Sequence, residues 1–183
     1  MGRTRLKMQE ISEIVGSDGL SVVVLTDEAK KSAVNIVIDH AMMVQLNLRR
    51  SKVRETGLML PEVLVSMFQV SKDQGYELMI YDVSEGQYKV TLLCRRTMAM
   101  HPIRISDAVL LSFISGIPLY MDDNLLHRQS SPYSSNKEGI SIPINVIDLG
   151  QLKVALEKAI ADEDYRLAGQ LKKEIDSRRG GNI

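Results

Sequence analysis

The chain has 183 residues, 44% of them hydrophobic and 25% charged, and its 23 basic side chains are balanced by 23 acidic ones. The length suits one domain plus an appendage, and no apolar run approaches the roughly 20 residues that cross a bilayer, which excludes an integral membrane protein. Residues 1–128 carry 15 basic and 15 acidic side chains, and residues 129–183 carry 8 of each. Neither part therefore has the strongly basic character of a dedicated DNA-binding protein.

The N-terminal segment and the single cysteine indicate an intracellular protein. Residues 1–7 are basic, but residues 8–13 lack the apolar core of a signal peptide. Cys94 lies in the alternating run 88–96, which favours a buried strand thiol over a nucleophile and suits a reducing compartment. We therefore expect a cytoplasmic location.

The first elements are predicted from β-branched runs and from helical spacing. Residues 20–26 and 34–38 are rich in valine and isoleucine, which predicts two strands. Apolar residues recur at helical spacing in residues 41–48, so a helix should follow. Residues 61–70 begin with a proline suited to a first helical turn and predict a second helix that ends near Gly75.

The pattern then returns to strands. Residues 77–83 and 87–94 flank a short connection that contains glycine, which predicts a β-hairpin. Residues 102–105 predict another strand. Residues 106–116 predict a helix that is capped by its first serine and ends at glycine, and residues 117–121 predict a final strand.

Strands followed by a helix thus occur around residues 20–50 and again around residues 77–121. This repeat predicts an α+β fold in which two similar strand-and-helix halves form one domain, rather than a regular parallel βαβ series. We place the domain at residues 1–128. The serine-rich stretch that follows has almost nothing to bury, so we expect residues 129–147 to be a linker.

Residues 148–179 predict a helical hairpin. Asp148 and Gln151 have the spacing of a capping box, and a turn is expected at residues 161–164. The predicted apolar faces consist of Leu152, Leu156, Ala159 and Ile160 in the first helix and of Tyr165, Ala168, Leu171 and Ile175 in the second. Helices of about 12 residues are individually marginal in water, so this seam should need a partner surface.

The run RISDAVLLSFISGIPLY at residues 104–120 resembles the signature of the bacterial bifunctional nuclease domain, in which Arg-Pro-Ser-Asp-Ala opens an apolar helix and a strand follows. The similarity covers about residues 5–128. It implies a nuclease that hydrolyses the phosphodiesters of DNA and RNA. The best-matched polar residues are Arg104, Ser106 and Asp107.

Two departures from that family bear on the chemistry. Where the family has Thr-His-Asp-Leu at a helix start, this chain has LPEV at residues 60–63, which keeps only the carboxylate of Glu62. The Gly-x-x-Glu-Ala of the family is replaced by DHAMM at residues 39–43, and the aspartate two positions before the family's arginine is Pro102 here. A domain that has lost catalytic groups is therefore the alternative to an active nuclease.

The run LEKAIADEDYRLAGQLKKEI at residues 156–175 resembles the UVR motif shared by nucleotide-excision-repair subunits and some protease adaptors. The resemblance implies a hairpin that binds itself, giving a homo-oligomer, or binds another UVR-motif protein through residues 148–179. A nuclease-like domain with such a hairpin is similar to the arrangement of Bacteroidetes members of the family. The second functional hypothesis is thus a non-catalytic adaptor linked to DNA repair or protein quality control.

Phosphodiester hydrolysis needs an activated water and nearby positive charge, which divalent metals commonly supply. Asp39, Glu62 and Asp107 are the candidate ligands of Mg²⁺ or Mn²⁺, because all three lie at expected helix starts or strand-to-helix junctions. Arg104 could grip a phosphate through two hydrogen bonds, and Asp107, Arg104, Ser106 and Glu62 form the candidate catalytic set. The structural alternative is that Glu62 and Asp107 only stabilise the positive ends of their helices, with Ser106 as a cap.

Binding of nucleic acid would rest on local basic segments. Residues 49–54 and the pair Arg95 and Arg96 are the concentrated basic segments before the tail, and they could contact a phosphate backbone. The alternative is that they form solvated faces. The sequence has no glycine-rich phosphate loop and no cysteine cluster, so classical nucleotide-binding chemistry finds no support. The expected cofactor is a divalent metal, Mg²⁺ or Mn²⁺, or none.

Overall fold

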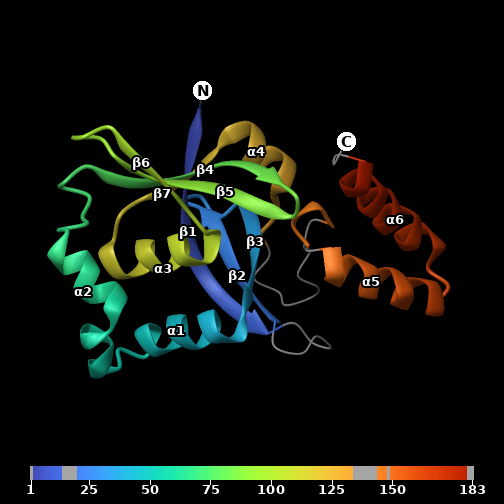
Figure 1. The fold of residues 1–183 in the computed structure, drawn as a ribbon, viewed down its shortest axis with the longest axis horizontal. Helices are drawn as coiled ribbons and strands as arrows, with labels where there is room; N and C mark the ends of the chain where they lie inside the picture. The colour runs from blue at the N-terminus through green and yellow to red at the C-terminus, as the bar shows by residue number, and fades with distance from the viewer. Residues whose placement is uncertain (1, 14–19, 134–143, 148, 181–183) are drawn as a thin grey trace. The chain divides into compact units, whose positions relative to one another are not determined.

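The computed structural model describes residues 2–13, 20–133, 144–147 and 149–180 (Figure 1). The chain divides into two compact units, which we treat separately. The first comprises Met1–Asp82 and Tyr88–Ser141, and the second comprises Val83–Gln87 and Ile142–Ile183. No helix of the described residues is long and apolar enough to span a membrane.

One mixed sheet with the strand order β6-β5-β4-β7-β1-β2-β3-β8 organises the first unit. Its strands are β1 (Arg3–Glu13), β2 (Leu20–Asp27), β3 (Ser32–Asp39), β4 (Tyr76–Ser84), β5 (Gln87–Cys94), β6 (Ala99–Ile103), β7 (Leu119–Asp122) and β8 (Ser131–Pro132). β7 runs parallel to β4 and antiparallel to β1. It therefore joins two groups of three strands into one sheet.

The two groups share the same order of elements. In the first half, β1, β2 and β3 are followed by α1 (His40–Arg50), and in the second half, β4, β5 and β6 are followed by α3 (Ile105–Ser115). The α+β class is confirmed. The first half contains one strand, β1, that the sequence alone did not predict, whereas all three strands of the second half were predicted.

The core of the first unit lies where the central strands meet the helices. The fully buried side chains are mostly valine, leucine and isoleucine, namely Val22, Val23, Leu25, Val34, Ile36, Leu46, Leu78, Ile80, Ile117, Met121 and Leu125. Figure 1 shows α1, α3 and α2 (Leu60–Met67) gathered together, and α3 contacts both other helices. The start of α2 lies against the last turn of α1, where Glu62 pairs with Arg49.

The start of α3 differs from the prediction, whereas its end does not. Arg104 is the N-cap residue and makes no capping hydrogen bond with its side chain, so Ser106 is not the cap. The helix ends at Gly116, whose φ of 69° lies in the left-handed region and whose amide donates to the carbonyl of Ser112 at 3.0 Å. Glycine suits this position because it has no Cβ to clash.

The predicted second helix is shorter and more exposed than its apolar pattern suggests. α2 ends at Met67, before the expected limit, and contains no buried residue. Met67 and Phe68 are 69% and 65% exposed. Apolar burial therefore contributes little to holding α2, and its link to α1 through Glu62 and Arg49 gains importance.

Four elements of the first unit were not predicted. They are β1, the 3-10 helix η1 (Arg54–Leu58), β8 and α4 (Asp123–Gln129). α4 begins where Asp122 accepts hydrogen bonds from the amides of Asn124 and Leu125. β8 pairs with β3 inside the range expected to be linker, so the sheet extends past residue 128. Most of the remaining predicted linker lies outside the described residues.

An ion-pair network around Glu77 connects three parts of the sheet. The Glu77 side chain is 7% exposed and pairs with Arg3 at 2.6 Å and with Arg95 at 2.9 Å. Arg3 also lies over the ring of Tyr120, with its Cζ 4.0 Å from the centroid. Burial alone would raise the pKa of Glu77, but the hydrogen bonds from Arg3 and Arg95 outweigh it and hold the pKa below its ordinary value.

The second unit contains the predicted helical hairpin. Its helices are α5 (Leu149–Ala161) and α6 (Tyr165–Gly180), and Asp164 caps α6 by accepting from the amide of Leu167 at 3.0 Å. The buried seam consists of Leu152, Ala159, Ala168, Leu171 and Ile175. The predicted cap residue Asp148 lies outside the described residues.

The seam of the hairpin is closed by the hairpin itself. Arg178 strengthens this closure, because it donates to the carbonyl of Ile147 at 2.6 Å and pairs with Glu174 at 2.8 Å. Tyr165, which was predicted on the seam, is instead 71% exposed, and Val154 is 65% exposed. Any need for a partner therefore arises from the outer faces of the hairpin and not from its seam.

We predict that Glu77→Gln destabilises the protein by about 1–3 kcal/mol, because two arginines lose the charge that satisfies them. The wild type should lose this stability as the pH falls below the ordinary glutamate pKa of about 4.3 and through the lowered folded pKa. Urea denaturation of both forms at pH 7 and pH 3 checks this. The exposed Glu55→Gln change is the control, and equal stability of Glu77→Gln and wild type at pH 7 would contradict the prediction.

Candidate functional site

The three carboxylates predicted from sequence all lie at helix starts. Asp39 is the N-cap of α1, Glu62 lies in the first turn of α2 and Asp107 lies in the first turn of α3. Negative charge is favourable at these positions because helix N-termini carry partial positive charge. The position of a carboxylate at a helix start therefore does not show whether it binds a ligand or only stabilises the helix. The residues with which each carboxylate pairs distinguish the two roles.

Asp107 is paired with Arg104 at the exposed start of α3. The Nε atom of Arg104 lies 2.7 Å from Oδ2 of Asp107, and its Nη2 atom lies 3.2 Å from Oδ1. The Arg104 side chain is 76% exposed and that of Asp107 is 35% exposed. The hydrogen bond to Asp107 and the charge of Asp107 raise the pKa of Arg104, and the charge of Asp39 adds to this effect.

α3 contacts both β3 and α1, and Asp39 lies at the junction of these two elements. Asp39 accepts a hydrogen bond through Oδ1 from the amide of Met42 at 2.7 Å and is exposed to solvent. Its charge acts on Arg104 more weakly than the charge of Asp107 does. None of the three side chains is buried, so all of them can meet a ligand from solvent.

Glu62 has a different environment. It pairs with Arg49 through two hydrogen bonds of 2.6 Å and 2.8 Å, and Arg49 also donates to the backbone and side-chain oxygens of Gln45 at 2.8 Å. The side chain of Arg49 is 3% exposed and that of Glu62 is 19% exposed. This pair ties α2 to α1, and Arg49 has no charge left to offer a nucleic acid.

The two ion pairs differ in how much free energy they contribute to the stability of the protein. Exposed ion pairs contribute about 0–1 kcal/mol, so Arg104 and Asp107 can exchange partners at little cost. Breaking a buried pair costs about 3–5 kcal/mol because a charge remains without a partner. We therefore assign Glu62 to the stability of α2, and Arg104, Asp107 and Asp39 to the candidate site.

The predicted metal ligands do not form one metal centre in this structure. Within the described parts of the chain, no three His, Cys, Asp or Glu side chains are grouped so that they could hold a metal ion. Both oxygens of Glu62 and both of Asp107 are bound by arginines, and Asp39 is engaged by its own helix. The set of Asp39, Glu62 and Asp107 therefore does not fit a shared cation as arranged.

The other sequence candidates are distributed around this site or away from it. Ser106 is half-buried in the first turn of α3, beside Asp107. Arg95 is bound by Glu77, and Arg96 donates to the side chain of Gln74. Cys94 is buried at the end of β5, in agreement with the expected strand thiol.

Sequence reasoning missed the partners of the carboxylates. The spacing of Arg104 and Asp107 was a usable signal, because residues three apart face each other on a helix. Glu62 and Arg49 are 13 residues apart on different helices. Only the packing of α1 against its neighbours reveals that this pair exists.

A comparison with known protein families assigns most of the first unit to one family. Residues 23–134 match the family model described as the bifunctional nuclease domain, and no curated protein matches the chain. The matched range begins within β2, ends just after β8, and includes Asp39, Arg104 and Asp107 but neither α5 nor α6. Because the match covers more than half of the chain, this protein belongs to the bifunctional nuclease domain family.

Proposed function

We propose that the first unit is a nuclease domain that binds a phosphodiester of DNA or RNA at Arg104. The observation that carries the proposal is the exposed guanidinium of Arg104, which is held by a solvent-accessible carboxylate and flanked by Asp39. Family membership supports the substrate class. Guanidinium groups match the geometry of phosphate oxygens and bind them through two hydrogen bonds.

A phosphate that enters this site competes with Asp107 for Arg104. Once Arg104 binds the phosphate, the carboxylate of Asp107 is released and can accept a proton from an attacking water, with Asp39 as the second nearby carboxylate. The water oxygen forms a bond to phosphorus, the bond from phosphorus to one sugar oxygen breaks, and that oxygen takes up the proton that Asp107 accepted from the water. Arg104 stabilises the negative charge that develops on the phosphate.

A second candidate function is that of a non-catalytic adaptor that acts through α5 and α6. Three apolar side chains on the outside of the hairpin favour it: Val154, Ile160 and Tyr165 are 65%, 53% and 71% exposed. The resemblance of this segment to the UVR motif supports a partner of the same kind. We propose that the partner is a second copy of the chain or another protein with such a hairpin.

Cleavage of single-stranded DNA and RNA by the purified protein tests the nuclease proposal. We expect Asp107→Asn and Arg104→Gln each to lower the cleavage rate by about 10²–10³-fold, because each removes charge that acts in the transition state. Assays with EDTA, Mg²⁺ and Mn²⁺ show whether a metal binds the carboxylates once Arg104 has moved to the substrate. Full activity of both variants would place the site elsewhere.

Glu62→Gln is the matched control for these variants. It removes the same charge from another helix start, but we expect it to lower the midpoint of thermal unfolding and to leave the rate of the folded protein nearly unchanged. Asp107→Asn should lower the cleavage rate and leave the midpoint of thermal unfolding nearly unchanged. A wild-type protein without cleavage under any metal condition would favour the adaptor function instead.

We expect the full-length protein to self-associate through the hairpin. Replacing Val154 and Tyr165 by serine should shift the protein toward the monomer in multi-angle light scattering, because these side chains lose apolar area that a partner would cover. Circular dichroism confirms that the helices persist. A wild-type monomer contradicts self-association, and an unchanged dimer of the variant places the interface on the first unit.

A further inference from the structure

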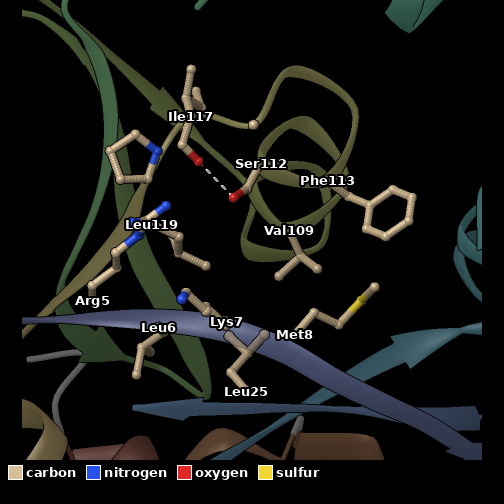
Figure 2. A pocket seen from close by; sticks show the side chains of 12 residues that line it. Arg5, Leu6, Lys7, Met8, Leu25, Val109, Ser112, Phe113, Ile117 and Leu119 are labelled. Carbon is tan, nitrogen blue, oxygen red and sulfur yellow. Dashed lines mark hydrogen bonds between the residues drawn. The ribbon is translucent and has the colours of Figure 1, made fainter. Parts of the chain in front are cut away.

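A cavity of about 280 Å³ lies between β1, α3 and the segment that joins α3 to β7 (Figure 2). Its residues include neither Arg104 nor Asp107 nor Asp39, so it is separate from the proposed nuclease site. β1 also precedes the residues that match the family model.

One side of the cavity is cationic. Arg5 and Lys7 lie two residues apart on β1, so their side chains point to the same face of the strand. Figure 2 shows their nitrogen atoms on the same side of the cavity, away from Phe113 and Met8. Both cations therefore lie where they can bind the same anionic group.

The contacts of Glu28 show that this convergence is real. Nη1 of Arg5 lies 3.7 Å from Oε1 of Glu28, and Nζ of Lys7 lies 3.2 Å from the same oxygen. Two cations share one carboxylate, so one positive charge remains in excess. The side chain of Glu28 is 57% exposed, and an exposed ion pair of this kind is displaced at a cost of about 0–1 kcal/mol.

The opposite side of the cavity is apolar and contains an aromatic ring. Met8, Val109 and Phe113 line it, and Phe113 is 40% exposed. The hydroxyl of Ser112 is committed, because it donates to the carbonyl of Ile117 at 2.8 Å. Polar recognition therefore falls to Arg5 and Lys7, and the remaining wall favours a flat apolar body.

We propose that this cavity binds an aromatic phosphate monoester of about the size of a mononucleotide. The phosphate would replace the Glu28 carboxylate between Arg5 and Lys7, and the ring would lie against Phe113 and Met8. Phosphate is favoured over carboxylate because its additional oxygens let a guanidinium and an ammonium bind it together. The cavity volume of about 280 Å³ lies just below the usual range of ligand pockets, which is about 300–1,000 Å³.

Two kinds of ligand carry an aromatic phosphate monoester: a free nucleotide and the phosphorylated end of a nucleic acid strand. Isothermal titration of the full-length protein with adenosine 5′-monophosphate, adenosine, inorganic phosphate and a 5′-phosphorylated oligodeoxynucleotide separates them. We expect saturable binding of the monophosphate at or below about 1 mM. Adenosine and inorganic phosphate should bind at least about tenfold more weakly, because adenosine lacks the phosphate and inorganic phosphate lacks the aromatic ring.

Substitutions then test the roles of the individual residues. Arg5→Gln and Lys7→Gln should each weaken monophosphate binding by about tenfold. Glu28→Gln should strengthen it by about two- to fivefold, because the competing carboxylate is removed. Phe113→Leu should weaken binding of the monophosphate but not of inorganic phosphate. Lys31→Gln, an exposed change outside the cavity, is the control, and thermal unfolding confirms that each variant is folded.

The outcomes decide between binding and general surface charge. Tighter binding by Glu28→Gln together with weaker binding by Lys7→Gln supports the site, and a preference for the oligodeoxynucleotide over the free nucleotide identifies strand ends as its ligand. Equal affinities for the monophosphate and for inorganic phosphate overturn it. An affinity that does not change in Glu28→Gln, or no binding of any phosphate probe, overturns it as well. None of these measurements depends on cleavage. A failure of the proposed binding site can therefore be distinguished from a failure of the proposed nuclease function.

Discussion

The pairing of β1 with β7 and β2 is the constraint on which the first unit depends. β1 lies between β7 and β2, so it joins the strands of the second half to those of the first. Leu6, which is 3% exposed, pairs across the strands with Leu119 on one side and Asp27 on the other. Without β1, each half would leave an unpaired strand edge, and such edges invite association with other chains. The starts of α1 and α3 would also lose the common sheet that brings them together.

The sequence predicted β2 and β3, which are buried on both faces, and missed β1, which joins the two halves of the sheet. β2 and β3 consist largely of valine and isoleucine, and the pattern is clear because nearly every position is buried. β1 alternates basic residues with Leu6 and Met8, since one face of this part of the sheet is accessible to solvent. The period of two was present, but the charges resemble a polar terminus. α4 was missed for a related reason, because a helix of seven residues offers few positions for a pattern.

The site could be predicted only as a set of residues. Helix starts attract carboxylates whether or not they act on a ligand, so Asp39, Glu62 and Asp107 were indistinguishable in the sequence. Burial distinguishes them in the structure. The pair of Glu62 with Arg49 is enclosed, and the pair of Asp107 with Arg104 is open to solvent. Burial of an ion pair depends on how separate elements pack, and no local pattern encodes that packing.

The distinction between buried and exposed ion pairs also applies to the other ion pairs described in the first unit. Enclosed pairs hold elements in place: Glu62 with Arg49 fixes α2, and Glu77 fixes β1 to β4 through Arg3. Open pairs hold cations in readiness, since Asp107 retains Arg104 and Glu28 retains Arg5 and Lys7. An exposed carboxylate costs a phosphate little to displace, yet it keeps the cation ordered until a ligand arrives. We propose the same exchange at both open sites, in which a ligand phosphate replaces a carboxylate whose exposed pair contributes only about 0–1 kcal/mol.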